Sequence, residues 1–98
     1  MLYNSQMWTV NVSKKASKQY KKLPKAIKGH FVTLLRDLTL SGPVVCWQNF
    51  SKLSGKKNVY HCHIKKGNPT YVAVWSVIDK QIKVMEVHYV GTHEKAPY

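Results

Sequence analysis

The feature that most constrains the fold is a set of three runs in the second half of the chain in which apolar and polar residues alternate. These runs cover residues 58–65, 70–78 and 81–90. A period of two predicts β-strands that bury one face. The breaks at 66–69 and 79–80 are short and contain turn-forming residues. The sequence therefore predicts three antiparallel strands joined by hairpins.

The same alternation assigns residues to the two faces of the predicted sheet, because neighbouring side chains of a strand point in opposite directions. The face expected to pack against helices carries Tyr60, Cys62, Ile64, Tyr71, Ala73, Trp75, Val77, Met85, Val87 and Tyr89. The opposite face carries His61, His63, Lys65, Val72, Val74, Ser76, Glu86 and His88. A surface with this many titratable side chains is unusual unless it has a function.

The first half of the chain predicts one strand and two helices. Alternation over residues 7–13 predicts the strand, and Ser13 is a suitable N-cap for the helix after it. Apolar residues then recur at helical spacing over residues 14–23 and, after Pro24, as far as Leu40. Proline is tolerated at the first position of a helix, so Pro24 is expected to begin the second one.

The second helix is expected to stop at Ser41-Gly42-Pro43, because glycine adopts the left-handed cap and proline cannot continue a helix. Residues 44–53 are interpreted as an irregular connection with a short extended piece at 44–47. The predicted order is β-α-α-β-β-β. This is an α+β fold in which two N-terminal helices pack on one face of a small, mainly antiparallel sheet.

The length predicts a single domain over residues 1–98, with 1–6 as a flexible N-terminal extension. The first seven residues do not have the basic and apolar pattern of a secretory signal, so we expect a cytoplasmic protein. Cys46 and Cys62 do not have the spacing of a metal site. In a cytoplasmic protein, such a pair is expected to be two reduced core thiols.

Charge is the feature that most constrains the partner. Sixteen lysine and arginine residues against four acids give a net charge of +12. Only Arg36 is an arginine, which favours diffuse attraction to phosphates over the reading of bases by forked guanidinium groups. The expected partner is therefore a nucleic acid. A membrane surface is disfavoured, since the sequence has no long apolar run and no basic amphipathic helix with a large apolar face.

His61 and His63 point the same way along a predicted strand, and Lys65 extends their row. Imidazole titrates near neutral pH, so it can both take and give a proton. RNA offers such a pair a reaction, because its 2'-hydroxyl can attack the neighbouring phosphorus while an acid protonates the leaving oxygen. A solvated sheet face is one alternative. A zinc site is another, with a further ligand from His88, His93 or Glu86.

Four phrases carry a resemblance to a known family. In chain order they are KKLPKAI at 21–27, SKLSG at 51–55, YVAVWSVID at 71–79 and VGTHEKAPY at 90–98. In this order and spacing they make the chain similar to the RelE/ParE toxins along nearly all its length. The resemblance implies a RelE-like fold and the toxin half of a toxin–antitoxin pair.

The ribonuclease members of this superfamily cleave messenger RNA, often in the ribosomal A site. By this resemblance, His61 and His63 take the place of two strand lysines. His93 takes the place of the basic residue after Val-Gly-x, and Tyr98 that of the terminal tyrosine. Histidines here make the chain more similar to the histidine-using branch represented by YafQ. The chain departs from the pattern at Val72, where RelE-like enzymes have an arginine that contacts the scissile phosphate.

The residues and the resemblance together predict a metal-independent endoribonuclease that uses no cofactor. His93 is the expected general acid, and His61 or His63 the general base. Tyr98 is expected to stack on a base or to position a proton.

Other residues are given supporting roles. The lysines expected to bind RNA are Lys65, as the phosphate clamp, and Lys52, Lys56 and Lys57 in the preceding loop. Glu86 and His88 are interpreted either as groups that tune the pKa of a neighbour or as a solvated pair. Trp47 and Phe50 are expected in the core rather than as stacking platforms for bases, and His30 on the surface of the second helix.

Partners and rival functions follow from the same resemblance. A toxin of this type implies messenger RNA, the ribosome and a cognate antitoxin in a hetero-oligomer, with an acidic or amphipathic antitoxin segment covering the basic surface. One rival is a ParE-like protein that inhibits DNA gyrase by binding it. Another is a noncatalytic RNA-binding module in which the histidines are incidental.

Overall fold

The chain folds into a helical layer and a five-stranded sheet in the computed structural model, which describes residues 7–98. The extension expected at 1–6 lies outside the described residues. In chain order the elements are β1 (Thr9–Val12), α1 (Lys14–Lys21), α2 (Lys25–Ser41), β2 (Ser51–Lys52), β3 (Val59–Lys65), β4 (Tyr71–Asp79), β5 (Val84–Thr92) and the 3-10 helix η1 (His93–Lys95). The predicted order is confirmed, with β2 and η1 as additions.

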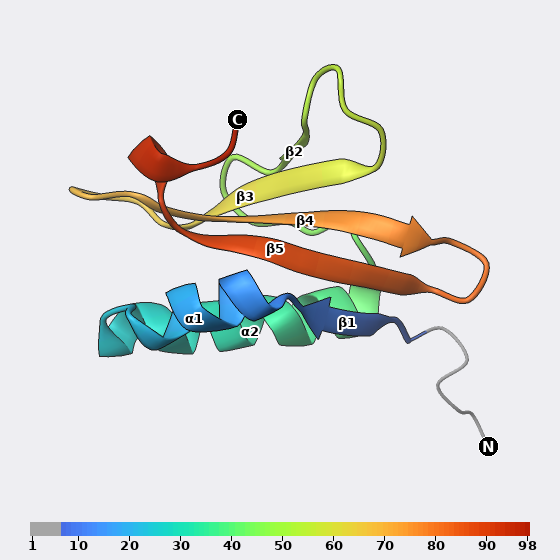
Figure 1. Cartoon of the computed structure of the whole chain (residues 1–98), viewed down its shortest axis with the longest axis horizontal. Helices are drawn as coiled ribbons and strands as arrows, with labels where there is room; N and C mark the ends of the chain where they lie inside the picture. The colour runs from blue at the N-terminus through green and yellow to red at the C-terminus, as the bar shows by residue number, and fades with distance from the viewer. Residues whose placement is uncertain (1–6) are drawn as a thin grey trace.

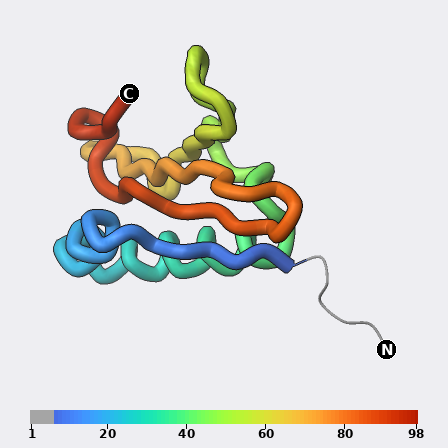
Figure 2. Tube along the Cα trace, turned by 45° about the vertical axis from the view of Figure 1, so that its right-hand side comes forward, coloured from blue at the N-terminus to red at the C-terminus, as the bar shows by residue number. Residues whose placement is uncertain are grey.

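The strands lie in the order β1-β5-β4-β3-β2. As the alternating runs predict, β3, β4 and β5 pair antiparallel, while β1 joins the edge of β5 in parallel. Figure 1 shows α1 and α2 on one face of this sheet and the C-terminal segment on the other. The same separation is visible from another angle in Figure 2. The α+β class with a mainly antiparallel sheet is therefore confirmed.

Local signals determine where the helices begin and end. Ser13 Oγ accepts a hydrogen bond from the Ala16 N–H at 3.0 Å, as expected of an N-cap. Pro24 is the N-cap of α2 rather than its first residue, since its ψ of 152° is still extended. Gly42 ends α2 with a φ of 90°, and a Cβ there would lie 3.0 Å from Trp8 Nε1. Within residues 7–98, no helix has the length and apolar character needed to cross a membrane.

The connection between α2 and β3 differs from the prediction. Residues 44–47 form no strand, and their apolar character is explained by Val45, which packs in the core. The extended piece is instead β2, whose Ser51 pairs with His61 of β3. The connection therefore adds an edge strand beside the two β3 histidines.

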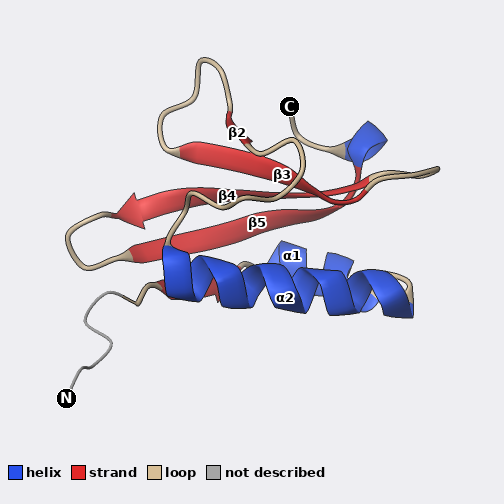
Figure 3. Ribbon diagram, turned by 180° about the vertical axis from the view of Figure 1, so that it is seen from behind, coloured by secondary structure: helices blue, strands red, loops and turns tan. Residues whose placement is uncertain are grey.

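The core lies between the helices and the sheet, where α2 runs along the strands (Figure 3). Its largest fully buried side chain is Trp75, whose indole N–H donates to the Pro43 carbonyl at 3.1 Å. Trp47 and Phe50 pack against this core, as expected. The predicted helix-packed face is confirmed for Tyr60, Cys62, Ile64, Tyr71, Ala73, Trp75, Met85 and Val87.

Val77, predicted on the same face, is buried but is not part of this core cluster, and Tyr89 departs from the prediction. Alternation predicts it against the helices, but it lies in a small second cluster with Val72 and Val74. A register shift is the reason, because Val74 pairs with Tyr89 whereas Trp75 pairs with Val87, so β5 contains one extra residue. Beyond this bulge the residues of β5 alternate again, but each lies on the face opposite to the one that the sequence predicts.

The two cysteines are free and lie in different environments. Cys62 is in the core, where burial raises the pKa of its thiol to about 12. Cys46 is exposed, so the prediction of two core thiols is right for Cys62 and wrong for Cys46.

Candidate active site

The rings of three histidines and a tyrosine meet where the C-terminal segment lies against β3. Figure 1 shows this segment on the sheet face opposite the helices. His61 and His63 belong to β3, and His93 begins η1 directly after β5. The ring centroids of His63 and His93 are 5.5 Å apart, and those of His61 and His63 are 6.2 Å apart. The Tyr98 ring lies 4.8 Å from His61 and 5.9 Å from His93. We call these four residues the histidine cluster.

Contacts at the end of β5 hold the C-terminal part of the cluster in place. The His93 N–H donates to the Thr70 carbonyl at 2.8 Å, which ties η1 to the start of β4. The Tyr89 hydroxyl donates to the Thr92 carbonyl at 2.8 Å. Gly91 makes room for this, since a Cβ there would lie 2.7 Å from Tyr89 Oη. The position of His93 therefore depends on the packing of Tyr89 over Gly91.

The two β3 histidines are held in their neutral form. Burial lowers the pKa of His61 below 6.5, the charge of His93 adds to this effect, and a hydrogen bond with Ser51 opposes it. Burial also lowers the pKa of His63, and the charges of His93, His61 and Lys66 lower it further. Both imidazoles are therefore mainly neutral at pH 7, which is the form that accepts a proton.

The Nδ1 atoms of His61 and His63 have different surroundings. Ser51 Oγ lies 3.3 Å from His61 Nδ1, across the β2–β3 pair, so the His61 ring is oriented by a neighbour. His63 Nδ1 is buried and has no hydrogen-bond partner within residues 7–98. A proton on this nitrogen would be a buried donor without an acceptor, which also disfavours the charged ring.

Tyr98 is a phenol rather than a phenolate at this site. Burial raises its pKa above 10.0, and the neighbouring Tyr89 and Cys62 add to the effect. The side chain is nevertheless 46% exposed. One part of the ring therefore covers the cluster while another remains available to stack on a base.

Two hollows flank the cluster and share His63. One, of about 360 Å³, lies between residues 67–70 of the β3–β4 turn, Thr92 and the start of η1. We call it the turn hollow. The other, of about 420 Å³, is lined in part by Trp47, Lys65 and Lys66, and we call it the lysine hollow.

Lys65 does not continue the histidine row. The register of β3 against β4 shifts between His63 and Lys65, so that Lys65 pairs with Tyr71 and lines the lysine hollow. The lysine whose charge acts on His63 is Lys66, which the sequence reasoning did not single out. Val72, at the position where the resemblance implies an arginine, is a fully buried apolar residue and cannot bind phosphate.

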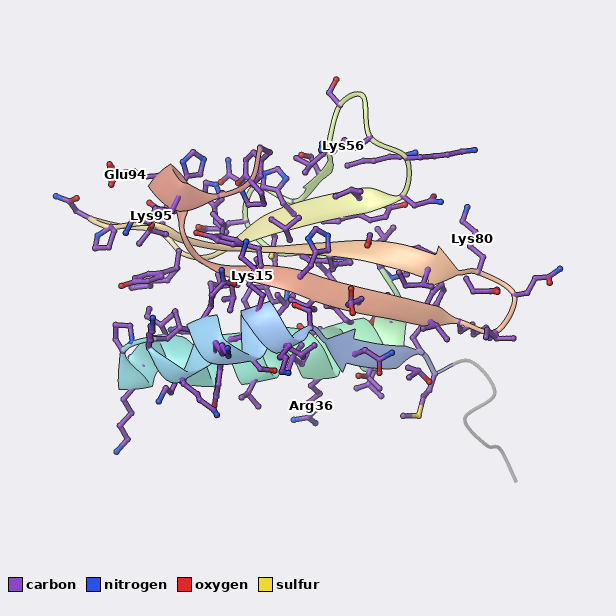
Figure 4. All side chains as sticks on the ribbon, in the orientation of Figure 1. Lys15, Arg36, Lys56, Lys80, Glu94 and Lys95 are labelled. Atoms are coloured by element: carbon purple, nitrogen blue, oxygen red, sulfur yellow. The ribbon has the colours of Figure 1, made fainter. Side chains whose placement is uncertain are left out.

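The remaining predicted residues lie around the cluster. Lys52 is exposed in β2, and Lys56 and Lys57 are exposed in the loop before β3. Figure 4 shows the loop that carries Lys56 on the same side of the sheet as η1 with Glu94 and Lys95. His30 is exposed on α2, as expected.

Glu86 and His88 form a separate group. Burial lowers the pKa of His88, the carboxylate of Glu86 opposes this shift, and Lys56 adds to it. The charges that shift the pKa values of His61 and His63 do not include Glu86 or His88. The pair is therefore linked electrostatically to Lys56 of the β2–β3 loop rather than to the two β3 histidines. In the described part of the chain, no three His, Cys, Asp or Glu side chains are arranged to hold a metal ion.

Comparison with known proteins identifies the fold. No protein-family model and no curated protein sequence matches the chain. The isolated RelE toxin of E. coli matches with a TM-score of 0.70 and 23% identity, covering 92% of this chain and 88% of that one. The RelE–RelB complex of Pyrococcus horikoshii gives 0.72 and 22%, covering 92% and 99%. The YoeB dimer of Staphylococcus aureus gives 0.70 and 19%, covering 89% and 98%. The chain therefore has the RelE fold that the sequence resemblance implies.

Proposed function

We propose that this chain is the toxin of a toxin–antitoxin pair and an endoribonuclease that cleaves messenger RNA on the ribosome, in the cytoplasm. The observation that carries the proposal is the histidine cluster on the open face of a RelE fold, with the rings of His63 and His93 5.5 Å apart. The net charge of +12 supports it, because such a surface attracts RNA without reading its sequence. Histidines in these positions correspond to the branch represented by YafQ.

The proposed reaction needs only the RNA and the cluster. His61 or His63 takes the proton of a ribose 2'-hydroxyl, and the 2'-oxygen attacks the adjacent phosphorus. The bond from phosphorus to the 5'-oxygen breaks, and His93 gives that oxygen a proton. The products are a 2',3'-cyclic phosphate and a 5'-hydroxyl end, so protons and bonds balance without a co-reactant.

The division of roles follows from the surroundings of each ring. His61 and His63 are kept neutral, which suits a general base. His93 is exposed at the start of η1, where it can exchange protons with solvent between turnovers. Lys66 lies close enough to act electrostatically on His63, so it is placed to stabilise the charge of the phosphorane. Lys65 assists from the lysine hollow.

The proposed partner is an antitoxin that covers the basic surface. An acidic or amphipathic segment that orders on binding would neutralise the +12 charge and bury the cluster. Solved RelE neighbours from E. coli and Pyrococcus horikoshii are complexes of a RelE protein with RelB. This pairing supports a toxin–antitoxin hetero-oligomer for the chain.

The test is cleavage of a defined message on purified ribosomes, with fragment ends mapped by primer extension. His93→Ala is expected to cut about 10²- to 10⁴-fold more slowly, the usual contribution of one acid or base catalyst. His30→Ala is the matched control, an exposed histidine on α2, and should cut at the parent rate. A parent rate for His93→Ala would remove that residue from the mechanism. If the parent leaves the message intact but blocks plasmid supercoiling by gyrase, the ParE-like alternative is correct.

A further inference from the structure

The turn hollow contains a carboxylate that the proposed reaction does not use. Glu94 is the second residue of η1 and lines this hollow beside His93. Among the residues that the structure describes, it forms no hydrogen bond or ion pair. Two of the other acids accept hydrogen bonds, Asp37 from Trp47 and Asp79 from the N–H groups of Gln81 and Ile82. The third, Glu86, raises the pKa of the neighbouring His88 by its charge. Glu94 lines a hollow beside the histidine cluster, and no residue that the structure describes is its hydrogen-bond or ion-pair partner.

Its position is electrostatically unfavourable for a protein that binds RNA. A carboxylate next to a phosphodiester site repels the substrate by its charge, against the general attraction of a chain whose net charge is +12. Figure 4 shows Glu94 projecting from η1 on the open side of the sheet, above the strands rather than toward the helices. Such a residue is a disadvantage unless it makes a specific contact with the bound RNA.

The walls of the hollow suit a flat, polar-edged ligand. Pro69 offers an apolar ring, and Asn68, Thr70 and Thr92 offer amide and hydroxyl groups. The Thr70 hydroxyl donates to the Gly67 carbonyl at 2.9 Å, so the turn is braced by its own side chain. A volume of about 360 Å³ lies within the range of small-ligand sites, in which a few polar groups fix the orientation of a mainly apolar ligand.

We infer that the turn hollow binds a nucleobase next to the scissile phosphate and that Glu94 selects guanine there. This inference rests on the proposed ribonuclease function. The turn hollow shares His63 and His93 with the cluster. A nucleotide whose phosphate lies between these two rings therefore places a neighbouring base at the mouth of the hollow. RNA-binding proteins read such splayed bases on their Watson–Crick edges.

The preference for guanine follows from hydrogen-bond geometry. Guanine presents a ring N–H and an amino group side by side, and a carboxylate accepts both in a bidentate pair. Adenine and cytosine offer an amino group beside a ring nitrogen lone pair, which repels the second oxygen. Uracil offers one N–H between two carbonyl groups, so it is the base that a carboxylate disfavours most.

The test uses synthetic messages on ribosomes that differ only in the nucleotide on either side of the cut. The parent is expected to favour guanine over uracil at one of these positions by about 5- to 150-fold, the usual discrimination of one bidentate contact. Glu94→Gln has the same shape but only one acceptor oxygen, so it cannot form the bidentate pair and this preference should fall to about 3-fold or less. Lys95→Gln is the matched control, the next residue of η1 but one that lines a different hollow, and should keep the parent preference.

The outcomes separate the inference from the function on which it rests. A parent that cuts no message overturns both. A parent that cuts without preferring guanine overturns the inference alone. A Glu94→Gln protein whose rate rises equally on every message also overturns it, because Glu94 would then act only through its charge.

Discussion

Gly91→Ala tests whether the packing of Tyr89 positions the C-terminal part of the cluster. A Cβ at residue 91 would lie 2.7 Å from Tyr89 Oη and 3.0 Å from its Cζ. Favourable contacts between such atoms begin near about 3.5 Å, so the ring must move by roughly 0.5–1 Å. It cannot move freely, because it is buried with Val72 and Val74 and its hydroxyl donates to the Thr92 carbonyl at 2.8 Å.

The expected cost has two parts. Overpacking of a well-packed site costs about 1–3 kcal/mol, and the lost hydrogen bond adds about 1 kcal/mol. A total of about 3 kcal/mol corresponds to a Tm lower by about 12–24 °C for a chain of 98 residues. Cleavage should also slow in the folded variant, because the Thr92 carbonyl held by Tyr89 directly precedes His93.

A double-mutant cycle, measured by thermal unfolding, tests directly whether a Cβ at residue 91 clashes with Tyr89. Tyr89→Phe removes the closest atom, so Gly91→Ala should destabilise the Tyr89→Phe protein by at least about 1 kcal/mol less than the parent. Gly29→Ala is the matched control, because nothing lies within 4 Å of a Cβ there and the residue is in α2. It should raise stability by about 0.5–1 kcal/mol. Additive costs for Gly91→Ala and Tyr89→Phe would refute the proposed clash.

Three further predictions concern thiols and imidazoles. Iodoacetamide should alkylate Cys46 and spare Cys62 in the folded protein, because burial raises the pKa of Cys62 to about 12, and peptide mass spectrometry showing equal labelling would contradict this. Stability measured by urea should fall as pH falls from 7 to 5. A pKa of His63 below 6.5 in the folded state means that the unfolded chain takes up more protons, so this contribution is present above pH 6.5 and lost on acidification. His63→Gln should reduce that slope, and an unchanged slope would count against the assignment. His63→Lys replaces a mainly neutral imidazole with a fixed positive charge, so cleavage at pH 7 should fall if His63 is the base and be retained if the site needs only a cation there.

Much of the fold could be predicted from residue alternation, because a strand with one buried face repeats every two residues regardless of its partners. This is why His61 and His63 are on the expected face. The errors begin where pairing between strands inserts a residue, as at the bulge before Tyr89 and the shift before Lys65. A bulge depends on how two strands fit together and on the layer beneath them. The alternation of residues within one strand therefore does not reveal it. The β4–β5 turn, predicted at 79–80, is longer than expected because β5 begins only at Val84 and Asp79 accepts backbone N–H groups within the turn.

The site was less predictable than the fold. Alternation placed the two β3 histidines, but His93 and Tyr98 follow the end of β5, and only the family resemblance indicated that they meet the others. Ser51 was missed because a two-residue strand has no measurable period. One feature of the sequence could have pointed to Glu94: it is an acid between the basic residues His93 and Lys95 in a chain that has only four acids.

The positive charge near His63 affects both the pKa of this residue and the binding of RNA. Burial is the main cause of the lowered pKa of His63, and the charges of His93, His61 and Lys66 lower it further. The same positive field attracts the phosphate. When a phosphodiester binds, its negative charge offsets that field, so the pKa values of His61 and His63 should rise in the complex. Each ring is then neutral before RNA binds and a stronger base once the 2'-hydroxyl is in place. A lysine in the same position stays charged in both states and cannot take part in this change, so histidine at these positions suits base catalysis rather than fixed charge.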